Sequence, residues 1–296
     1  MEELIQAKGN SYYLPGITKI GVVKTAEDKV VLIDSGLDDE DGARALRALT
    51  ERGWTLEAIY NTHSHADHIG GNAYLQKQTG CRIFAPDLEC DFVNHTILET
   101  SYFYGGFPPM SLRRQVFLAE PSRAEVLTEA DLPEGWEMIP LPGHWFNMVG
   151  FRTADDVVFL ADLVLSEKAL NGRSKIPYLV DAGAYLDTLE KAKDMQAALF
   201  IPGHAAVTDD ISDLAQKNID KIYEITDCLM DMLEKPLSVD QILQRVFRKY
   251  GLLMDLSQYV LIGSTIRSYL AWLEATGRIR YISKDSMLFW VRTAAR

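Results

Sequence analysis

The chain has 296 residues, which is long enough for one large domain and one small one. Apolar residues make up 47% of it and charged residues 24%, a composition ordinary for a soluble globular protein. Its formal net charge is −12, and residues 1–210 carry 18 Lys and Arg against 32 Asp and Glu, so most of the chain repels a phosphate backbone. No apolar run is long enough to cross a bilayer. The acidic N-terminus lacks the basic segment followed by an apolar segment that is typical of a secretory signal. We therefore expect a cytoplasmic protein without a membrane partner.

The N-terminal third alternates between strand and helix patterns. The β-branched runs KIGVVKT and KVVLIDSG, joined by the polar turn 26–28, predict a hairpin. Cys81, which opens the run CRIFAP, is predicted to be a small core residue, and the three cysteines lack the spacing of disulfides or a thiolate metal site. The further elements predicted here are a helix over 38–53, a strand over 56–62, a helix over 70–80 and a strand over 81–86.

Residues 87–118 interrupt this alternation. The run YFYGGFPP at 102–109 mixes aromatic residues with Gly and Pro, which predicts irregular structure. A long ordered loop of this kind often forms a lid or a binding wall. The alternative is a surface excursion that packs its own aromatic side chains.

Strand patterns dominate the next part of the chain. They are followed by one amphipathic helix and a last strand that ends in Pro-Gly-His. Strands and helices in two similar halves are typical of an α/β sandwich of two mixed sheets with helices outside. The predicted elements are strands at 136–143, 148–154 and 157–164, a helix at 182–196 and a strand at 198–204.

The C-terminal part has a different pattern. A long amphipathic helix covers 213–234, and the capping box Ser238–Gln241 opens a second helix after Pro236. A third helix follows over 260–277, and residues 278–292 form a predicted hairpin. Helices followed by a hairpin indicate a winged helix-turn-helix. The predicted domains are therefore a catalytic domain at 1–210 and a helical connector with a winged helix at 211–296.

The strongest chemical signal is the run THSHADHIGG at 62–71, between an apolar strand and a helix. Side chains alternate in an extended stretch, so His63 and His65 point to the same side. Asp67 and His68 come where the chain turns into the helix and approach from another direction. Imidazole nitrogens and carboxylate oxygens suit zinc and other first-row metals. The run therefore predicts a metal site.

Three more residues join this set. His144 and His204 each follow an apolar run and a Pro-Gly turn, so both lie at strand ends. Asp162 ends the apolar run VVFLAD, where a lone buried carboxylate is costly unless a cation partners it. His95 stands alone in the interrupted segment and is interpreted as an ordinary polar residue.

The order HxHxDH, Pro-Gly-His, strand-ending Asp and final Gly-His resembles the metallo-β-lactamase superfamily over about residues 15–210. The resemblance implies an αββα sandwich, in which one metal is held by His63, His65 and His144, a second by Asp67, His68 and His204, and Asp162 bridges both. Two such ions about 3.5–4 Å apart share a water and lower its pKa, giving a hydroxide nucleophile. Asp67 beside that water would accept its proton.

The resemblance implies a hydrolase with two divalent ions and a small-molecule substrate. Zn²⁺ is the expected metal, with Fe or Mn as alternatives, because the same ligands accept all three. The expected substrate is a small thioester, ester or lactone. The chain resembles the glyoxalase II-like branch with an appended C-terminal winged helix. Glyoxalase II enzymes usually have Thr-Pro-Gly-Ser after Pro-Gly-His, whereas residues 145–148 here are Trp-Phe-Asn-Met, which disfavours a glutathione thioester.

Three other functions remain open. Endoribonucleases of the same branch use such metals on a phosphodiester. Persulfide dioxygenases share HxHxDH but hold one iron with two histidines and an aspartate, which would leave His68 and His204 idle. A DNA-binding regulator would hold a duplex with basic residues of the third helix and the wing, for which Arg267, Arg278, Arg280 and Lys284 are available.

Residues near His144 are candidates for contact with the substrate. Trp145 and Phe146 follow it directly, so they either line a pocket for an apolar acyl or aryl group or brace the histidine from behind. We predict the pocket for Trp145 and Phe146, and Tyr178 as a further wall residue. A homodimer is a possible assembly.

Overall fold

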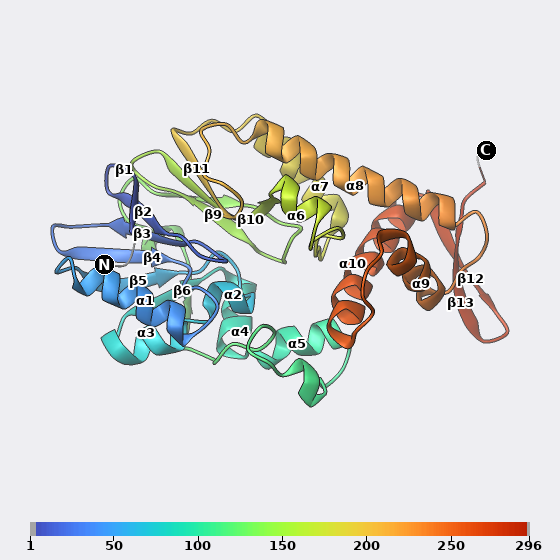
Figure 1. Cartoon of the computed structure of the whole chain (residues 1–296), viewed down its shortest axis with the longest axis horizontal. Coiled ribbons are helices and arrows are strands. Elements are labelled where there is room, and N and C mark those ends of the chain that lie inside the picture. The colour runs from blue at the N-terminus through green and yellow to red at the C-terminus, as the bar shows by residue number, and fades with distance from the viewer. Residues whose placement is uncertain (1–3, 295–296) are drawn as a thin grey trace.

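The computed structural model describes residues 4–294 and consists of two stacked sheets with helices on their outer faces (Figure 1). The first sheet has seven strands in sequential order, and the predicted hairpin at its centre pairs Val22 with Leu32. Its strands are β1 (Ile5–Lys8), β2 (Ser11–Leu14), β3 (Ile20–Lys24), β4 (Lys29–Ile33), β5 (Thr55–Tyr60), β6 (Arg82–Ala85) and β7 (Ala124–Val126).

The second sheet has four strands in the order β11-β10-β9-β8. Tyr60 of the first sheet and Phe151 and Phe159 of the second belong to one buried apolar cluster, which fills the space between the sheets. This pair of sheets with outer helices confirms the predicted α/β sandwich. The strands are β8 (Glu137–Pro140), β9 (Val149–Arg152), β10 (Val157–Leu165) and β11 (Leu199–His204).

Helices cover both outer faces. Helices α1 and α3 lie on the first sheet, where Ala45, Leu49 and Leu75 join its buried cluster, and α7 and α8 lie on the second sheet (Figure 1). Helix α1 begins at the side chain of Asp38, which accepts a hydrogen bond from the Asp41 backbone amide at 2.9 Å. The helices are α1 (Asp39–Thr50), α2 (Ala66–Ile69), α3 (Asn72–Thr79), α6 (Glu167–Asn171), α7 (Ala182–Lys193) and α8 (Ser212–Met232).

The segment 87–118 is more regular than predicted. It contains α4 (Asp87–Asn94), α5 (Ile97–Tyr104) and a short 3₁₀ helix at 110–112. Pro86 precedes α4, and Gly105 ends α5 in the left-handed conformation with φ of 76°. The aromatic run therefore begins as the last turn of a helix, and the Gly/Pro pattern becomes irregular only after it.

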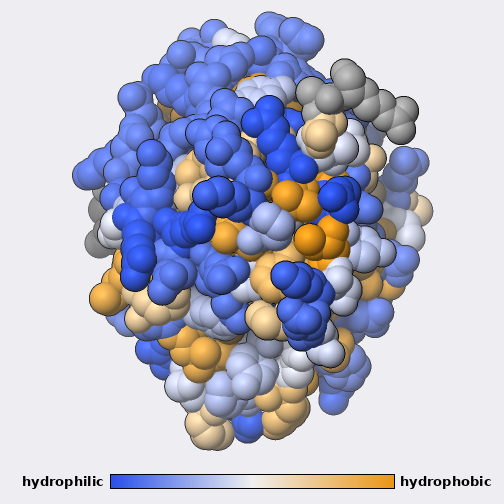
Figure 2. All heavy atoms as spheres, turned by 90° about the vertical axis from the view of Figure 1, so that its right-hand side faces the viewer, coloured by the Kyte–Doolittle hydropathy of each residue, from blue (hydrophilic) through white to orange (hydrophobic). Residues whose placement is uncertain are grey.

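The C-terminal part follows the predicted order of elements. Helix α8 extends away from the sandwich, and α10 returns beside α7 and α5 (Figure 1). The outer surface at this end is mostly hydrophilic with apolar patches (Figure 2). The elements are α9 (Val239–Tyr250), which has the predicted capping box, α10 (Leu256–Ala275), β12 (Ile279–Lys284) and β13 (Met287–Arg292).

One buried apolar core joins this part to the second sheet. Phe200 of β11, Ile222 of α8 and Ile266 of α10 belong to the same cluster. Hydrogen bonds also cross the predicted boundary at residue 210, because the Asn218 side chain pairs with both backbone groups of Leu165 at 3.0 Å. The predicted division at 210 therefore falls inside a shared core.

None of the helices among the described residues has the length and apolar character that a bilayer span requires. Cys81, Cys90 and Cys228 are free thiols, as their spacing predicts, and Cys81 is buried in the core of the first sheet.

Candidate metal centre

The predicted ligands meet at the ends of strands from both sheets. His63 follows β5, and His65 immediately precedes α2, which carries Asp67 and His68. His144 lies in the turn between β8 and β9. Asp162 and His204 come from the parallel neighbours β10 and β11.

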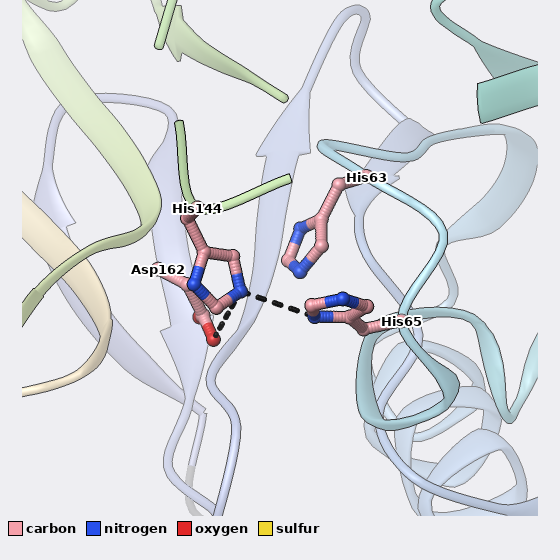
Figure 3. A group of neighbouring side chains, drawn as sticks. All are labelled: His63, His65, His144 and Asp162. Atoms are coloured by element: carbon pink, nitrogen blue, oxygen red, sulfur yellow. Dashed lines mark hydrogen bonds and ion pairs between the residues drawn. The ribbon is translucent and has the colours of Figure 1, made fainter. Parts of the chain in front are cut away.

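The ligand atoms form two groups, each within 4.8 Å. The first group is His63, His65, His144 and Asp162, which point toward one another in Figure 3. The second group is Asp67, His68 and His204. All seven predicted ligands are thus brought together, and His95 is in neither group.

Asp162 contacts histidines of both groups. Its Oδ1 lies 3.0 Å from Nε2 of His68, and its Oδ2 lies 3.1 Å from Nε2 of His204 and 3.5 Å from Nε2 of His144. Strand β10 continues past Asp162 to Leu165, so the carboxylate is within the strand and not at its end. A kink at Ala161, which has φ of 47°, lies directly before it.

Two glycines make room for this arrangement. A Cβ on Gly203 would lie 2.7 Å from Oδ1 of Asp162, so a larger residue would displace the carboxylate. Gly143 has φ of 118°, and a Cβ there would lie 2.2 Å from the backbone nitrogen of Tyr185. The Pro-Gly pairs before both histidines therefore allow close backbone approach, although Pro202 and Gly203 lie within β11 and do not form the predicted turn.

A buried carboxylate that was not predicted fixes two of the imidazoles. Nδ1 of His68 donates to Oδ2 of Asp34 at 2.7 Å, and the Thr62 hydroxyl donates to the same oxygen at 2.8 Å. With its proton given to Asp34, Thr62 Oγ1 accepts from Nδ1 of His63 at 3.0 Å. Nε2 of both histidines is thereby the ring nitrogen that faces the site.

Backbone carbonyls fix two more imidazoles in the same way. Nδ1 of His144 donates to the Tyr178 carbonyl at 3.1 Å, and Nδ1 of His204 donates to the Ile17 carbonyl at 2.8 Å. The lone pair of His144 Nε2 then faces Nδ1 of His65 at only 3.0 Å. Nδ1 of His65 therefore donates to Nε2 of His144, and a metal ion that binds both nitrogens would replace this proton.

Several buried polar atoms of the site also lack a hydrogen-bond partner. One is Nε2 of His63, and two more are Nε2 of His68 and Oδ1 of Asp162, which lie 3.0 Å from each other without the geometry of a hydrogen bond. An unpaired buried donor or acceptor is costly, and metal ions satisfy lone pairs of these types. The residues therefore fit a metal centre.

The segment 17–19 supports the second group from the N-terminal side. Thr18 donates its hydroxyl proton to Oδ2 of Asp67 at 2.7 Å, next to the carbonyl of Ile17 that holds His204. The Lys19 ammonium donates to the carbonyls of Pro202 at 3.1 Å and of Gly203 at 3.4 Å, just before His204. Three consecutive residues thus fix parts of one ligand group.

Replacing Thr18 with Val is expected to weaken the second group selectively. Valine has a similar shape but cannot donate to Asp67, and loss of such a supporting hydrogen bond typically lowers metal affinity by about 10–100-fold. Metal stoichiometry measured against a graded chelator should then show one weakened ion per chain. Thr18→Ser, which keeps the hydroxyl, is the control, and equal weakening by both substitutions would contradict the role of this hydrogen bond.

Charge differs between the two groups in the metal-free protein. Burial lowers the pKa values of His63, His65 and His144, so these imidazoles are neutral. Burial also acts to lower the pKa of His204, but the carboxylates of Asp162 and Asp67 raise it to about 10. Burial acts in the same direction on His68, where Asp162 and Asp34 outweigh it and raise the pKa.

These pKa values predict different pH dependences of metal binding. A metal ion binds neutral imidazole, so binding at the second group must displace protons from His68 and His204. Below the pKa of His204, affinity at this group should fall by up to about a hundredfold per pH unit, because two protons compete with the metal. Affinity at the first group should stay nearly constant near neutral pH. Chelator competition at pH 6.5, 7.5 and 8.5 measures both slopes, and equal slopes would refute the assignment.

The loop between His63 and His65 is held by an acid that the sequence did not reveal. Glu89 of α4 accepts hydrogen bonds from the Ser64 amide at 3.1 Å, from the Ser64 hydroxyl at 2.7 Å and from the Asn147 amide at 2.8 Å. It thus ties the motif to the turn that carries His144. Burial raises the pKa of Glu89 to about 7, against the lowering effect of these hydrogen bonds.

The position of Trp145 differs from the prediction that this residue lines a substrate pocket. Its side chain is fully buried, its Nε1 donates to the Ser64 hydroxyl at 2.8 Å, and its ring centroid lies 4.6 Å from that of His65. It therefore braces His65 from behind, which is the alternative that the sequence left open. Phe146 stacks on Phe92 with ring centroids 5.9 Å apart and lies outside the residues lining the cleft described next.

A cleft with two lobes opens beside the ligands. One lobe, of about 450 Å³, reaches Asp67, Asp162 and His204, and the other, of about 400 Å³, reaches His65 and Asp67. Both volumes are in the range of small-molecule sites. The two lobes share Asp67, Val116, Tyr178, Gln258 and Leu261. Tyr178 is therefore a wall residue, as predicted, and the segment 87–118 contributes Val116.

An αββα sandwich with a buried cluster of imidazoles and carboxylates at the ends of its strands defines a metal-dependent enzyme of the metallo-β-lactamase type. The family sequence model of the metallo-beta-lactamase superfamily matches residues 13–204, and the chain belongs to this superfamily. Membership confirms the expectation of a metal-dependent hydrolase drawn from the HxHxDH motif.

Individual relatives are distant. The chain is 24% identical over 250 residues to a probable metallo-hydrolase of Bacillus subtilis, a match covering 74% of this chain and 78% of that protein. A hydroxyacylglutathione hydrolase of Rhodopseudomonas palustris is 51% identical over 57 residues, which are 18% of this chain and 22% of that protein.

Solved structures support the fold over nearly the whole chain. A beta-lactamase domain protein from Burkholderia ambifaria has a TM-score of 0.72 at 16% identity and covers 99% of this chain and 94% of its own. A metallo-beta-lactamase family protein from Thermus thermophilus has the same TM-score and identity, with 96% and 99% covered. The C-terminal part is therefore included in the shared fold.

Proposed function

We propose that the protein is a dinuclear metal hydrolase of a small carboxylic thioester, ester or lactone. The observation that carries this proposal is the position of Asp162, whose two oxygens face histidines of both ligand groups at 3.0 and 3.1 Å. A carboxylate placed in this way suits a bridge between two ions. Zinc is the proposed metal, because imidazole and carboxylate ligands of this kind are typical of catalytic zinc sites.

Two bound divalent ions would supply a nucleophilic hydroxide and polarise the scissile carbonyl. The chain's own residues would orient this chemistry. Asp67, held by Thr18, directs a carboxylate into both lobes of the cleft, where it can accept a proton from the attacking water. Burial acts to raise the pKa values of Asp67 and Asp162, but His68 and His204 hold both values below their ordinary range. Both acids therefore stay ionised at neutral pH.

The walls of the cleft favour a small molecule over nucleic acid. They contain more aliphatic and aromatic than cationic side chains, and the carboxylate of Asp67 lines both lobes while that of Asp162 lines the larger one. A phosphodiester backbone needs a track of cations, and the acidic large domain does not provide one. We propose that the C-terminal elements, which we interpret as a winged helix, shape this cleft and do not hold DNA.

The test is turnover by the zinc-loaded protein of a panel containing thioesters, aryl esters, lactones, a phosphodiester and a persulfide. Hydrolysis of carboxylic substrates that stops on chelation and returns with zinc supports the proposal. Turnover of the phosphodiester alone, or oxygen uptake with a single bound iron, would overturn it in favour of a nuclease or a sulfur dioxygenase.

A further inference from the structure

The two lobes of the cleft differ in chemistry. The larger lobe has an exposed Arg173 together with Ser174 and opens beside His204. The smaller lobe lies beside His65 and is lined by aromatic and aliphatic side chains and by Asp67, Glu99, Arg114 and Asp255. We call it the aromatic lobe and define it by Phe103, Phe117, Tyr178 and Leu261.

Three chain segments build the aromatic lobe. Phe103 comes from α5 and Phe117 from the segment after the 3₁₀ helix, and only 8% and 7% of their surfaces are exposed. The ring of Tyr178 lies edge-on to Phe103 with centroids 5.2 Å apart. Leu261 of α10 is partly buried and completes the wall from the C-terminal side.

The ionisable groups of this lobe are one guanidinium and several carboxyl groups, most of which have contacts inside the protein. Arg114 donates to the Ser257 hydroxyl at 2.9 Å, which joins the segment over the lobe to α10. Asp255 accepts from the Gln258 amide at 2.8 Å and begins that helix. Glu99 lies 3.8 Å from Nε2 of His65 and is directed at this ligand. A substrate group that enters between Phe103 and Phe117 meets apolar surface, whereas Arg114 is a cation whose bond to the Ser257 hydroxyl leaves its charge uncompensated.

We propose that the aromatic lobe binds the acyl side of the substrate and selects an aromatic or branched apolar acyl group. This inference rests on the hydrolase function proposed above and specifies its substrate class. Hydrolysis breaks the bond between the acyl carbon and sulfur or oxygen, adds the hydroxyl of water to the acyl carbon and gives a proton to the leaving group. The leaving group then occupies the larger lobe past Arg173.

Helix α10 has a defined part in this selection. Leu261 and Gln258 line both lobes, so they lie where the two parts of a substrate would meet. Side chains at 258, 261, 262 and 265 face the cleft at helical spacing. The C-terminal part of the chain therefore sets the size of the acyl group.

The experiment compares two thioesters of N-acetylcysteamine, acetyl and phenylacetyl, which share one uncharged leaving group. In the zinc-loaded full chain, Leu261→Trp should narrow the aromatic lobe and lower the ratio of kcat/KM for the phenylacetyl thioester to kcat/KM for the acetyl thioester by about tenfold. Leu253→Trp is the matched control, because Leu253 is 78% exposed and outside the cleft. Equal losses on both thioesters, or no loss on either, would overturn the inference.

A second variant and a binding measurement keep the test decisive. Leu261→Ala enlarges the lobe and should raise kcat/KM for a naphthylacetyl thioester relative to the phenylacetyl one. Calorimetry should show that phenylacetate binds the zinc-loaded protein more tightly than acetate, and that Leu261→Trp removes this difference whereas Leu253→Trp keeps it. If no thioester, ester or lactone is hydrolysed, the hydrolase proposal fails, while this binding result still decides the role of the lobe. Equal affinities for the two acids in the parent protein would refute the lobe's role.

Discussion

The Asp162→Asn protein is expected to bind less than about one metal ion per chain and to lose roughly a thousandfold of its hydrolytic activity, since ligation of this kind is worth several kcal/mol. The substitution preserves shape and removes one negative charge. That charge lies 3.0 Å from His68, 3.1 Å from His204 and 3.5 Å from His144, so its loss affects both ligand groups at once. Elemental analysis after gel filtration measures the metal content directly.

Two comparisons make this result specific. Asp209→Asn removes the same charge from an exposed position after β11 and should retain full metal content and activity. Thermal melting without metal should show that the Asp162→Asn protein is folded, so that lost binding is not lost structure. Two tightly bound ions in Asp162→Asn, or activity within about threefold of the parent, would exclude a bridging role.

The metal ligands were predictable because their signal is local. His63, His65, Asp67 and His68 fall within six positions, and the chemistry of each is in its own side chain. The residues that orient these ligands were not predicted from the sequence. Asp34 ends an apolar strand, as Asp162 was expected to, and applying the same rule to it would have indicated its role.

Other supports of the site leave little or no trace in sequence. The partner of His204 is the Ile17 backbone carbonyl, which every residue possesses. Thr18 lies 49 positions from Asp67, and Glu89 holds Ser64 from a helix in a segment that the sequence shows as irregular. Contacts of this kind depend on how distant segments pack, and periodicity does not reveal packing partners.

Trp145 shows the limit of arguments from chain position. Its place next to His144 indicates proximity to the site, but adjacent residues of an extended turn point in opposite directions. In the structure its ring packs against that of His65, and its indole N–H is satisfied by Ser64. A large amphipathic side chain beside a ligand is thus as suited to bracing as to binding.

The domain boundary predicted at residue 210 also shows a difference between the sequence pattern and the packing of side chains. Composition changes near residue 210, and the helices after it are regular enough to indicate a separate domain. Their buried faces, however, complete the core of the second sheet. Ser268 of α10 accepts from the Ala182 amide at 2.8 Å, and Thr265 accepts from the Leu179 amide at 3.2 Å.

Removing residues 211–296 is therefore expected to abolish stable folding of the remainder. The deletion would expose apolar side chains of α7 and β11 that now pack against α8 and α10, together with backbone amides now capped by Thr265 and Ser268. Burial of each large side chain contributes about 1.5–3 kcal/mol, and a whole domain has only about 5–15 kcal/mol of stability. The fragment 1–210 should be insoluble, or soluble with strong dye binding and no cooperative thermal transition.

Two matched substitutions test, in the full chain, whether the second sheet and the C-terminal helices share one core. Tyr269 of α10 is fully buried in the shared cluster, and Tyr269→Ala should lower the free energy of unfolding by about 3–5 kcal/mol, as large-to-small core substitutions do. Tyr223→Ala on α8 is the control, since Tyr223 is 45% exposed. Because one core spans both parts, Tyr269→Ala should shift a single unfolding transition seen by circular dichroism and by metal release alike. A fragment 1–210 that melts cooperatively near the parent temperature, or two separate transitions in the full chain, would show instead that the parts are independent domains.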